Sequence, residues 1–202
     1  MGRLARLLAL VVLLLPSLAW ADSPLTSVEF WKAYTDVPAV VKAHESGKLE
    51  PDQVAFLLSS APVDQRAALI SALPFRGGDE EVLRAALARK YGCDPKKVDS
   101  RLCPEEACCL GYLMGRQNFY AASLAKPLLK RARSGLPTSF TVAIVETLLY
   151  AQDAMLYGGG SSKVWPLVAK TLADKKLKND LRPEARASIM EYLNLYREEH
   201  RH

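Results

Sequence analysis

The sequence predicts an all-α protein: an irregular array or orthogonal bundle of about nine short helices, hairpin-like or solenoid-like in order and stapled by disulfides. Three observations predict this class. Apolar residues recur at helical spacing, whereas no segment alternates polar and apolar residues as a strand would. Proline and acidic residues open the periodic segments, and glycine closes them. Most segments are about 8 to 15 residues long, so their stability must come from packing on one another.

The first half of the chain contains short helical segments that begin at capping residues or prolines. Thr26 and Ser27 can cap the first segment, and Pro38 and Pro62 open two of the next. The acidic run that starts at Asp79 suits the positive end of a helix dipole. The helices predicted here cover residues 26–34, 38–47, 52–60, 62–73, 79–91 and 94–100.

The second half continues the same pattern with longer segments. Pro104, followed by two glutamates, opens one helix, and Pro127 is predicted to kink or split the next. Pro166 falls in the first turn of a later helix, where its missing N–H costs nothing. The helices predicted here cover residues 104–117, 119–133, 137–157, 163–176 and 183–199.

The segment 137–157 is predicted to be the central helix, because it is apolar around most of its circumference. Its polar residues are Glu146, Tyr150, Asp153 and Tyr157. They are spaced four, three and four residues apart, so they lie along one face of the helix.

The N-terminal segment 1–21 has the pattern of a cleaved secretory signal peptide. Leu7 to Leu15 is an unbroken apolar run, too short for the ~20 residues of a membrane span. A small-x-small sequence ends at Ala21, where we expect cleavage. The mature chain, 22–202, is predicted to form a single α-helical domain in the periplasm or outside the cell.

The composition excludes several classes of function. Cleavage would remove two arginines and no acidic residue, which lowers the formal charge from +5 to +3 and predicts no nucleic-acid binding. The longest later apolar stretch, 140–157, contains Glu146 and Asp153, so no membrane span is expected after cleavage. No pattern of ligands indicates a metal or another cofactor.

All four cysteines fall within 93–109, in the stretch CDPKKVDSRLCPEEACC. The spacings are nine, four and zero intervening residues, so the chain lacks the Cys-x-x-Cys pairs typical of zinc and thioredoxin-like sites. In an exported chain, four clustered cysteines favour two disulfides over metal binding or reactive thiols. These bridges would clamp the short helix 94–100 onto its neighbours.

The spacing also favours one pairing of these cysteines. Cys108 and Cys109 are adjacent, and a bond between them would close a strained ring. Six residues of helix separate Cys103 from Cys109 by about 9 Å, past the ~7 Å reach of a disulfide. By elimination we expect Cys103–Cys108 and Cys93–Cys109, provided that the backbone at Cys103 folds back toward the helix.

Two surfaces could carry function. Glu146 and Asp153 could act as an acid/base pair on a glycan of the cell wall, although the solvent-facing or boundary line of a central helix is the simpler explanation. Two basic faces, Lys126 with Lys130 and Arg133, and Lys175 with Lys178, could contact an anionic polymer or could simply be solvated.

Because no catalytic motif stands out, the sequence favours an exported protein-binding protein: an adaptor, inhibitor or immunity-type partner of another envelope or secreted protein. The alternative is a cell-wall or glycan-directed hydrolase that uses Glu146 and Asp153.

Overall fold

A computed structural model describes residues 23–75, 77–118, 120 and 122–199, and these residues form an all-helical structure. The helices predicted from the sequence are present, and no strand occurs among the described residues. In chain order the elements are η1 (Phe30–Tyr34), α2 (Pro38–Ser46), α3 (Pro51–Leu57), α4 (Val63–Ala72), α5 (Asp79–Tyr91), η2 (Pro95–Ser100), α6 (Pro104–Gln117), α7 (Ala122–Gly135), α8 (Phe140–Tyr157), η4 (Ser161–Lys163), α9 (Val164–Ala173) and α10 (Pro183–Glu199).

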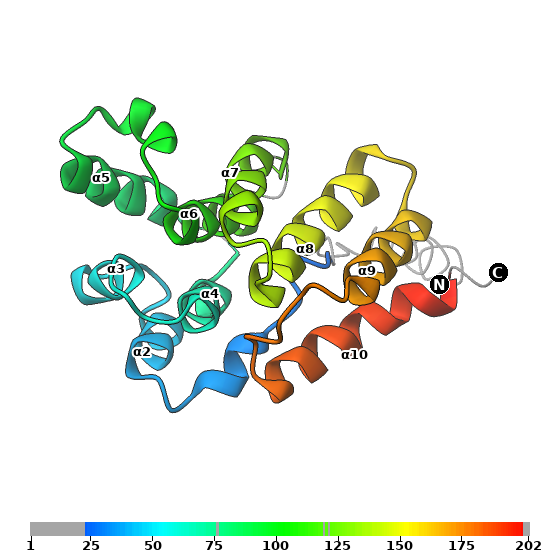
Figure 1. Ribbon diagram of the computed structural model, residues 1–202. Helices are drawn as coiled ribbons and strands as arrows, with labels where there is room; N and C mark the ends of the chain where they lie inside the picture. Colours follow the sequence, from blue (N-terminus) through cyan, green and yellow to red (C-terminus); the bar gives the residue numbers. More distant parts are fainter. Residues whose placement is uncertain (1–22, 76, 119, 121, 200–202) are drawn as a thin grey trace, which may run out of the picture.

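The helices form a curved array of neighbours in sequence, as Figure 1 shows. α6, α7, α8 and α9 follow one another across the molecule, and each packs against the next. α2, α3 and α4 form a separate group that joins the array through the contact of α4 with α6. α10 returns along α9 and packs on η1, so the two ends of the described chain meet.

Helix α8 is the central element, as its apolar sequence predicted. It contacts α4, α6, α7 and α9, and most of its side chains are buried. Its close approach to α6 depends on Gly115, because a Cβ there would lie 2.4 Å from Cδ1 of Leu149 and 2.9 Å from Cδ2 of Leu25. Glycine therefore sets the spacing between these two helices.

The start of the described chain, Ser23 to Thr26, is inserted against α6 and α8. The hydroxyl of Ser23 donates to Oε1 of Gln152 at 2.6 Å. The buried guanidinium of Arg116 donates to the carbonyl oxygens of Leu25 and Thr26, each at 3.2 Å. Both partners are buried and polar, so each compensates the other for the loss of water.

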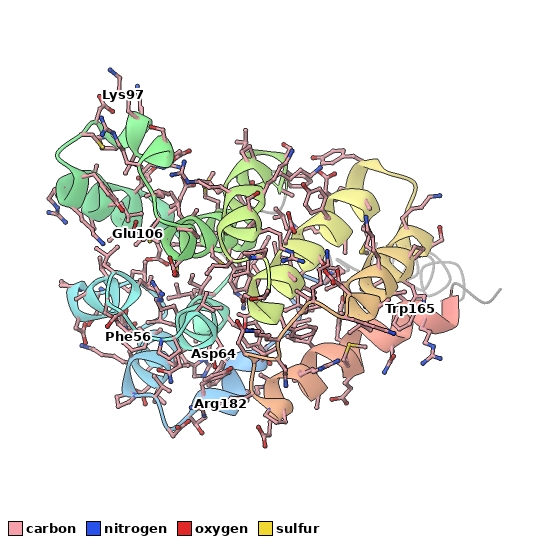
Figure 2. All side chains as sticks on the ribbon, viewed as in Figure 1. Phe56, Asp64, Lys97, Glu106, Trp165 and Arg182 are labelled. Atoms are coloured by element: carbon pink, nitrogen blue, oxygen red, sulfur yellow. The ribbon has the colours of Figure 1, made fainter. Side chains whose placement is uncertain are left out.

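Arg182, just before α10, ties the C-terminal helix to η1. Its guanidinium pairs with Asp36 and lies 4.3 Å from the ring centroid of Tyr34. The hydroxyl of Tyr34 donates in turn to Asp64 of α4 at 2.8 Å. Figure 2 shows Arg182 and Asp64 on the same side of the molecule, where three distant segments meet.

Several helix bounds differ from the predicted ones for local reasons. Helix α8 begins at Phe140 instead of Pro137, because the hydroxyl of Ser139 caps it by accepting from the N–H of Val142 at 3.1 Å. Helix α7 runs through Pro127 without a break. The first predicted helix is reduced to the short 3-10 turn η1.

Some predictions fall outside the described residues. These are the signal peptide 1–21 with its cleavage site after Ala21, and the predicted helix start at residue 119. In the described part of the chain, no helix combines the length and the apolar character that crossing a membrane would require.

Candidate functional site

The two polar faces singled out in the sequence meet each other in the structure. The basic face of α7 (Lys126, Lys130 and Arg133) packs alongside the polar line of α8 because the two helices lie side by side. Lys126 pairs with Asp153, and its ammonium lies 5.2 Å from the ring centroid of Tyr150. Lysine and carboxylate thus neutralise each other near one end of this seam.

At the other end of the seam a cleft of about 360 Å³ opens between α7, α8 and α9. We call it the α8–α9 cleft. Its apolar lining residues are Ala143 on α8, Leu167 on α9 and Leu177 after α9. The polar lining residues are Arg133, Glu146, Thr147, Tyr150, Lys170, Thr171 and Asp174. Sequence reasoning therefore found Glu146 and Tyr150, which line the cleft, but had no means of finding its α9 wall.

Several of these polar groups already have partners within the protein. Thr147 donates to the carbonyl oxygen of Ala143 at 2.8 Å, and its hydroxyl lies 2.6 Å from that of Thr171. Arg133 donates to Asp174 at 3.1 Å and to the carbonyl oxygen of Pro137. These donors and acceptors already bond within the protein, so few of their hydrogen bonds are available to a ligand.

Glu146 is different. Its side chain is 20 % exposed, and its Oε2 lies 4.0 Å from Nε of Arg133, beyond hydrogen-bond distance. No described residue donates a hydrogen bond to this carboxylate. Burial raises the pKa of Glu146, while the positive charges of Arg133 and Lys130 oppose the rise. Glu146 thus lines the cleft as a partly buried carboxylate that has an ion-pair contact but accepts no hydrogen bond from a described residue.

Two other polar groups of the cleft have neither a hydrogen-bond nor an ion-pair partner among the described residues, in contrast to Glu146 with its ion pair: they are the hydroxyl of Tyr150 and the ammonium of Lys170. Burial, followed by the nearby charge of Glu146, raises the pKa of Tyr150. The cleft therefore presents one acceptor, one phenol and one cation to whatever enters it.

The structure does not bring Glu146 and Asp153 to a common site. Asp153 is paired with Lys126 and does not line the cleft. Their positions differ by seven residues, which corresponds to about 10 Å along the helix axis, wider than the separations of glycosidase carboxylate pairs.

All four cysteines, Cys93, Cys103, Cys108 and Cys109, are free thiols, and the predicted disulfide staples are absent. Cys103 is the N-cap of α6, and its carbonyl oxygen already accepts from Ala107 at 2.9 Å. The backbone therefore does not fold back, and five residues of helix place Cys103 about 7.5 Å from Cys108, past the reach of a disulfide.

The two helical thiols are also inaccessible. Cys108 and Cys109 are buried on α6, and burial is the main cause that raises the pKa of both, that of Cys109 to about 12. Such thiols ionise poorly and are inert as nucleophiles. In the described part of the chain, no three His, Cys, Asp or Glu side chains gather as metal ligands.

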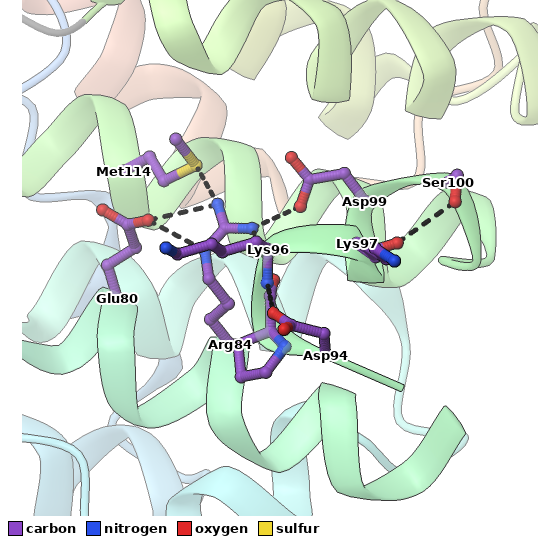
Figure 3. Close-up of polar contacts among 9 residues, drawn as sticks. Glu80, Arg84, Asp94, Lys96, Lys97, Asp99, Ser100 and Met114 are labelled. Atoms are coloured by element: carbon purple, nitrogen blue, oxygen red, sulfur yellow. Dashed lines mark hydrogen bonds and ion pairs between the residues drawn. The ribbon is translucent and has the colours of Figure 1, made fainter. Parts of the chain in front are cut away.

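An arginine takes the place of the predicted staple around η2. Arg84 of α5 pairs with Glu80 at 3.1 Å and with Asp99 of η2, and it reaches the sulfur of Met114 at 3.3 Å (Figure 3). Beneath it, Val98 is fully buried. A charged contact and one apolar anchor thus hold the short helix on α5.

A second buried contact joins α5 to α6. Glu106, labelled in Figure 2, is 2 % exposed and accepts from Lys90 at 2.6 Å, from Tyr91 at 2.5 Å and from the N–H of Cys103 at 3.1 Å. Burial alone would raise the pKa of Glu106, but these donors hold it below its ordinary value. In turn, the hydrogen bond to Glu106 is the main cause that raises the pKa of Tyr91 to about 12.

The second predicted basic face keeps its exposure: Lys175 and Lys178 lie at the surface after α9. Neither ammonium has an ion-pair partner among the described residues.

Comparison of the chain with protein-family models, with curated proteins and with solved structures finds no match in any of the three.

Proposed function

We propose that the chain is an exported binding protein, which contacts another envelope or secreted protein by taking up part of it in the α8–α9 cleft. The observation that carries this proposal is the cleft itself, whose lining combines apolar side chains with polar groups that make no hydrogen bond to a described residue. Such a combination is typical of binding sites, since the apolar surface supplies affinity and the polar groups fix orientation.

A binding role has more support than the glycan-directed hydrolase. The predicted glycan hydrolase needs two carboxyl groups that flank one glycosidic bond. Asp153 is held by Lys126 outside the cleft, and the other carboxylate of the cleft, Asp174, is bonded to Arg133. Glu146 is left as a single carboxylate without a catalytic partner.

Export is proposed from the leader pattern of residues 1–21. The free cysteines do not add to this support, although burial shields the thiols of Cys108 and Cys109. The anionic-polymer alternative retains only the Lys175 and Lys178 surface, because Lys126 and Arg133 of the other basic face are paired within the protein.

Site-specific crosslinking tests the binding role. A diazirine amino acid is placed at Leu167, in the cleft wall, or at Ala85, an exposed position on α5 at the other end of the array. Each variant is produced with its leader in its native cells and irradiated. We expect one predominant partner at position 167 and none of it at position 85.

Two results would contradict the proposal. One is the same set of crosslinked proteins at both positions, which indicates random collision. The other is cleavage of isolated cell wall by the purified protein with a rate that Glu146→Gln and Asp153→Asn abolish, which would establish the hydrolase.

A further inference from the structure

Resting on the proposed binding function, the geometry points to the group that the α8–α9 cleft receives: we propose that it takes the basic side chain of a lysine or arginine, presented by an otherwise apolar segment of the partner protein. Glu146 is its counter-ion, and the apolar lining residues receive the neighbouring residues of that segment.

The first argument is the missing donor at Glu146. Its carboxylate lines the cleft, is only 20 % exposed and has its nearest cation at 4.0 Å. A partly buried carboxylate has lost part of its hydration, and hydrogen-bond donors that replace this water lower the cost. An ammonium or guanidinium entering the cleft supplies such donors, together with the opposite charge.

The second argument is that the protein's own arginine is engaged elsewhere. Its two terminal nitrogens donate to Asp174 at 3.1 Å and to the carbonyl oxygen of Pro137. Its Nε stays 4.0 Å from Oε2 of Glu146, beyond hydrogen-bond distance. Arg133 therefore offsets part of the charge of Glu146. The carboxylate oxygens of Glu146 stay available to accept hydrogen bonds from a ligand.

The positive charges around the cleft do not prevent the entry of a cation. Lys130 and Lys170 are exposed, so water and salt screen them, and their ammonium groups can swing outward. Glu146 is half-buried, and a donor in direct contact with it acts at lower effective dielectric. Because Glu146 is partly buried and the two lysines are exposed, the carboxylate acts more strongly on a bound ligand. We therefore expect the ligand group to carry a positive charge.

The remaining groups select a peptide over a small amine. Lys170 and the hydroxyl of Tyr150 can donate to backbone carbonyl oxygens of an extended segment. Leu167, Leu177 and Ala143 form the surface against which its apolar side chains pack. A volume of about 360 Å³ accommodates a basic side chain with part of its neighbours.

Calorimetric titration with capped tripeptides tests this inference. The probes are acetyl-Leu-Lys-Leu-amide, its norleucine analogue of equal shape without charge, and its glutamate analogue. We expect the lysine peptide to bind, and Glu146→Gln to weaken this binding by at least about tenfold. Glu191→Gln removes an exposed charge on α10 and should leave the affinity unchanged.

Equal binding of the lysine and norleucine peptides, or stronger binding of the glutamate peptide, would overturn the inference. So would unchanged affinity in a folded Glu146→Gln protein, with folding checked by thermal unfolding. If a partner crosslinks at position 167 while the lysine peptide fails to bind, the binding function stands and this inference falls. If no partner crosslinks there, the binding function itself falls.

Discussion

The Oε2 of Glu146 lies 4.0 Å from Nε of Arg133, an ion pair that is too long to be a hydrogen bond. The guanidinium of Arg133 is used by Asp174 instead, at 3.1 Å. Consequently α8 carries a partly buried carboxylate that accepts no hydrogen bond from a described residue. Groups of this kind destabilise the fold slightly and are typical of places where a ligand binds.

The first prediction concerns the pH dependence of this cost. Burial raises the pKa of Glu146 in the folded state above its ordinary value of 4.5. Ionisation is therefore unfavourable for folding: the cost is absent below the unfolded pKa and grows as pH rises through the folded pKa. The groups that face Glu146 are Lys130 and Arg133 on α7, and Tyr150, Lys170 and Asp174 within the cleft.

We expect Glu146→Gln to be more stable relative to wild type at pH 7 than at pH 4, because the amide cannot ionise. Urea unfolding at both pH values measures the difference, and Glu191→Gln serves as the exposed control. A Glu146→Gln protein that loses stability at pH 7 would mean that Arg133 fully compensates the carboxylate.

The second prediction concerns the packing of α8 on α6. Gly115→Ala places a methyl group against Leu149 and Leu25, both fully buried. Overpacking costs about 1 to 3 kcal/mol, and the better helix propensity of alanine returns up to about 1 kcal/mol. We therefore expect a net loss of about 1 kcal/mol in the free energy of unfolding.

Gly78→Ala is the matched control for this substitution, since a Cβ there meets nothing within 4 Å. It should change the free energy of unfolding by less than about 1 kcal/mol in either direction. Equal stability of Gly115→Ala and wild type in urea would show that α6 and α8 can separate freely.

The third prediction is that Arg84 fixes η2. Arg84→Met removes the pairs with Glu80 and Asp99, which should cost about 1 kcal/mol because both carboxylates are partly exposed. We expect faster hydrogen exchange in residues 95–102 with little change elsewhere. Arg89→Met, an exposed position on the same helix, should leave exchange unaltered. Unaltered exchange in Arg84→Met would leave Val98 as the main anchor.

The fourth prediction concerns the thiols. In the native protein, a maleimide should not modify Cys108 or Cys109, because both are buried and ionise poorly. After unfolding in urea without reductant, all four cysteines should react, as expected for free thiols. Mass spectrometry counts the labels. Fewer than four labels in urea would show that disulfides form after all.

The sequence predicted the helices well, because apolar spacing and proline positions are local properties. It also identified the polar line of α8 and the basic face of α7 as two separate surfaces. It could not show that Lys126 and Asp153 pair, since partners 27 residues apart depend on how α7 packs against α8. The same holds for the cleft, whose second wall comes from α9.

For the cysteines, the sequence predicted bonds that the structure does not contain. Their clustering in an exported chain favoured disulfides, which is a rule about composition and compartment. The outcome depends on geometry: α6 begins at Pro104, immediately after Cys103, and its regular rise keeps Cys103 and Cys108 apart. Arg84, which does hold η2, was an ordinary surface residue in the sequence.

The most direct test of binding through the α8–α9 cleft is competition between peptide and partner. The protein with a diazirine amino acid at Leu167 is irradiated in envelope extract with acetyl-Leu-Lys-Leu-amide or with its norleucine analogue. We expect the lysine peptide to abolish the crosslink to the partner and the norleucine peptide to leave it intact. A crosslink of equal yield with both peptides would contradict the proposal that the partner enters this cleft with a basic side chain.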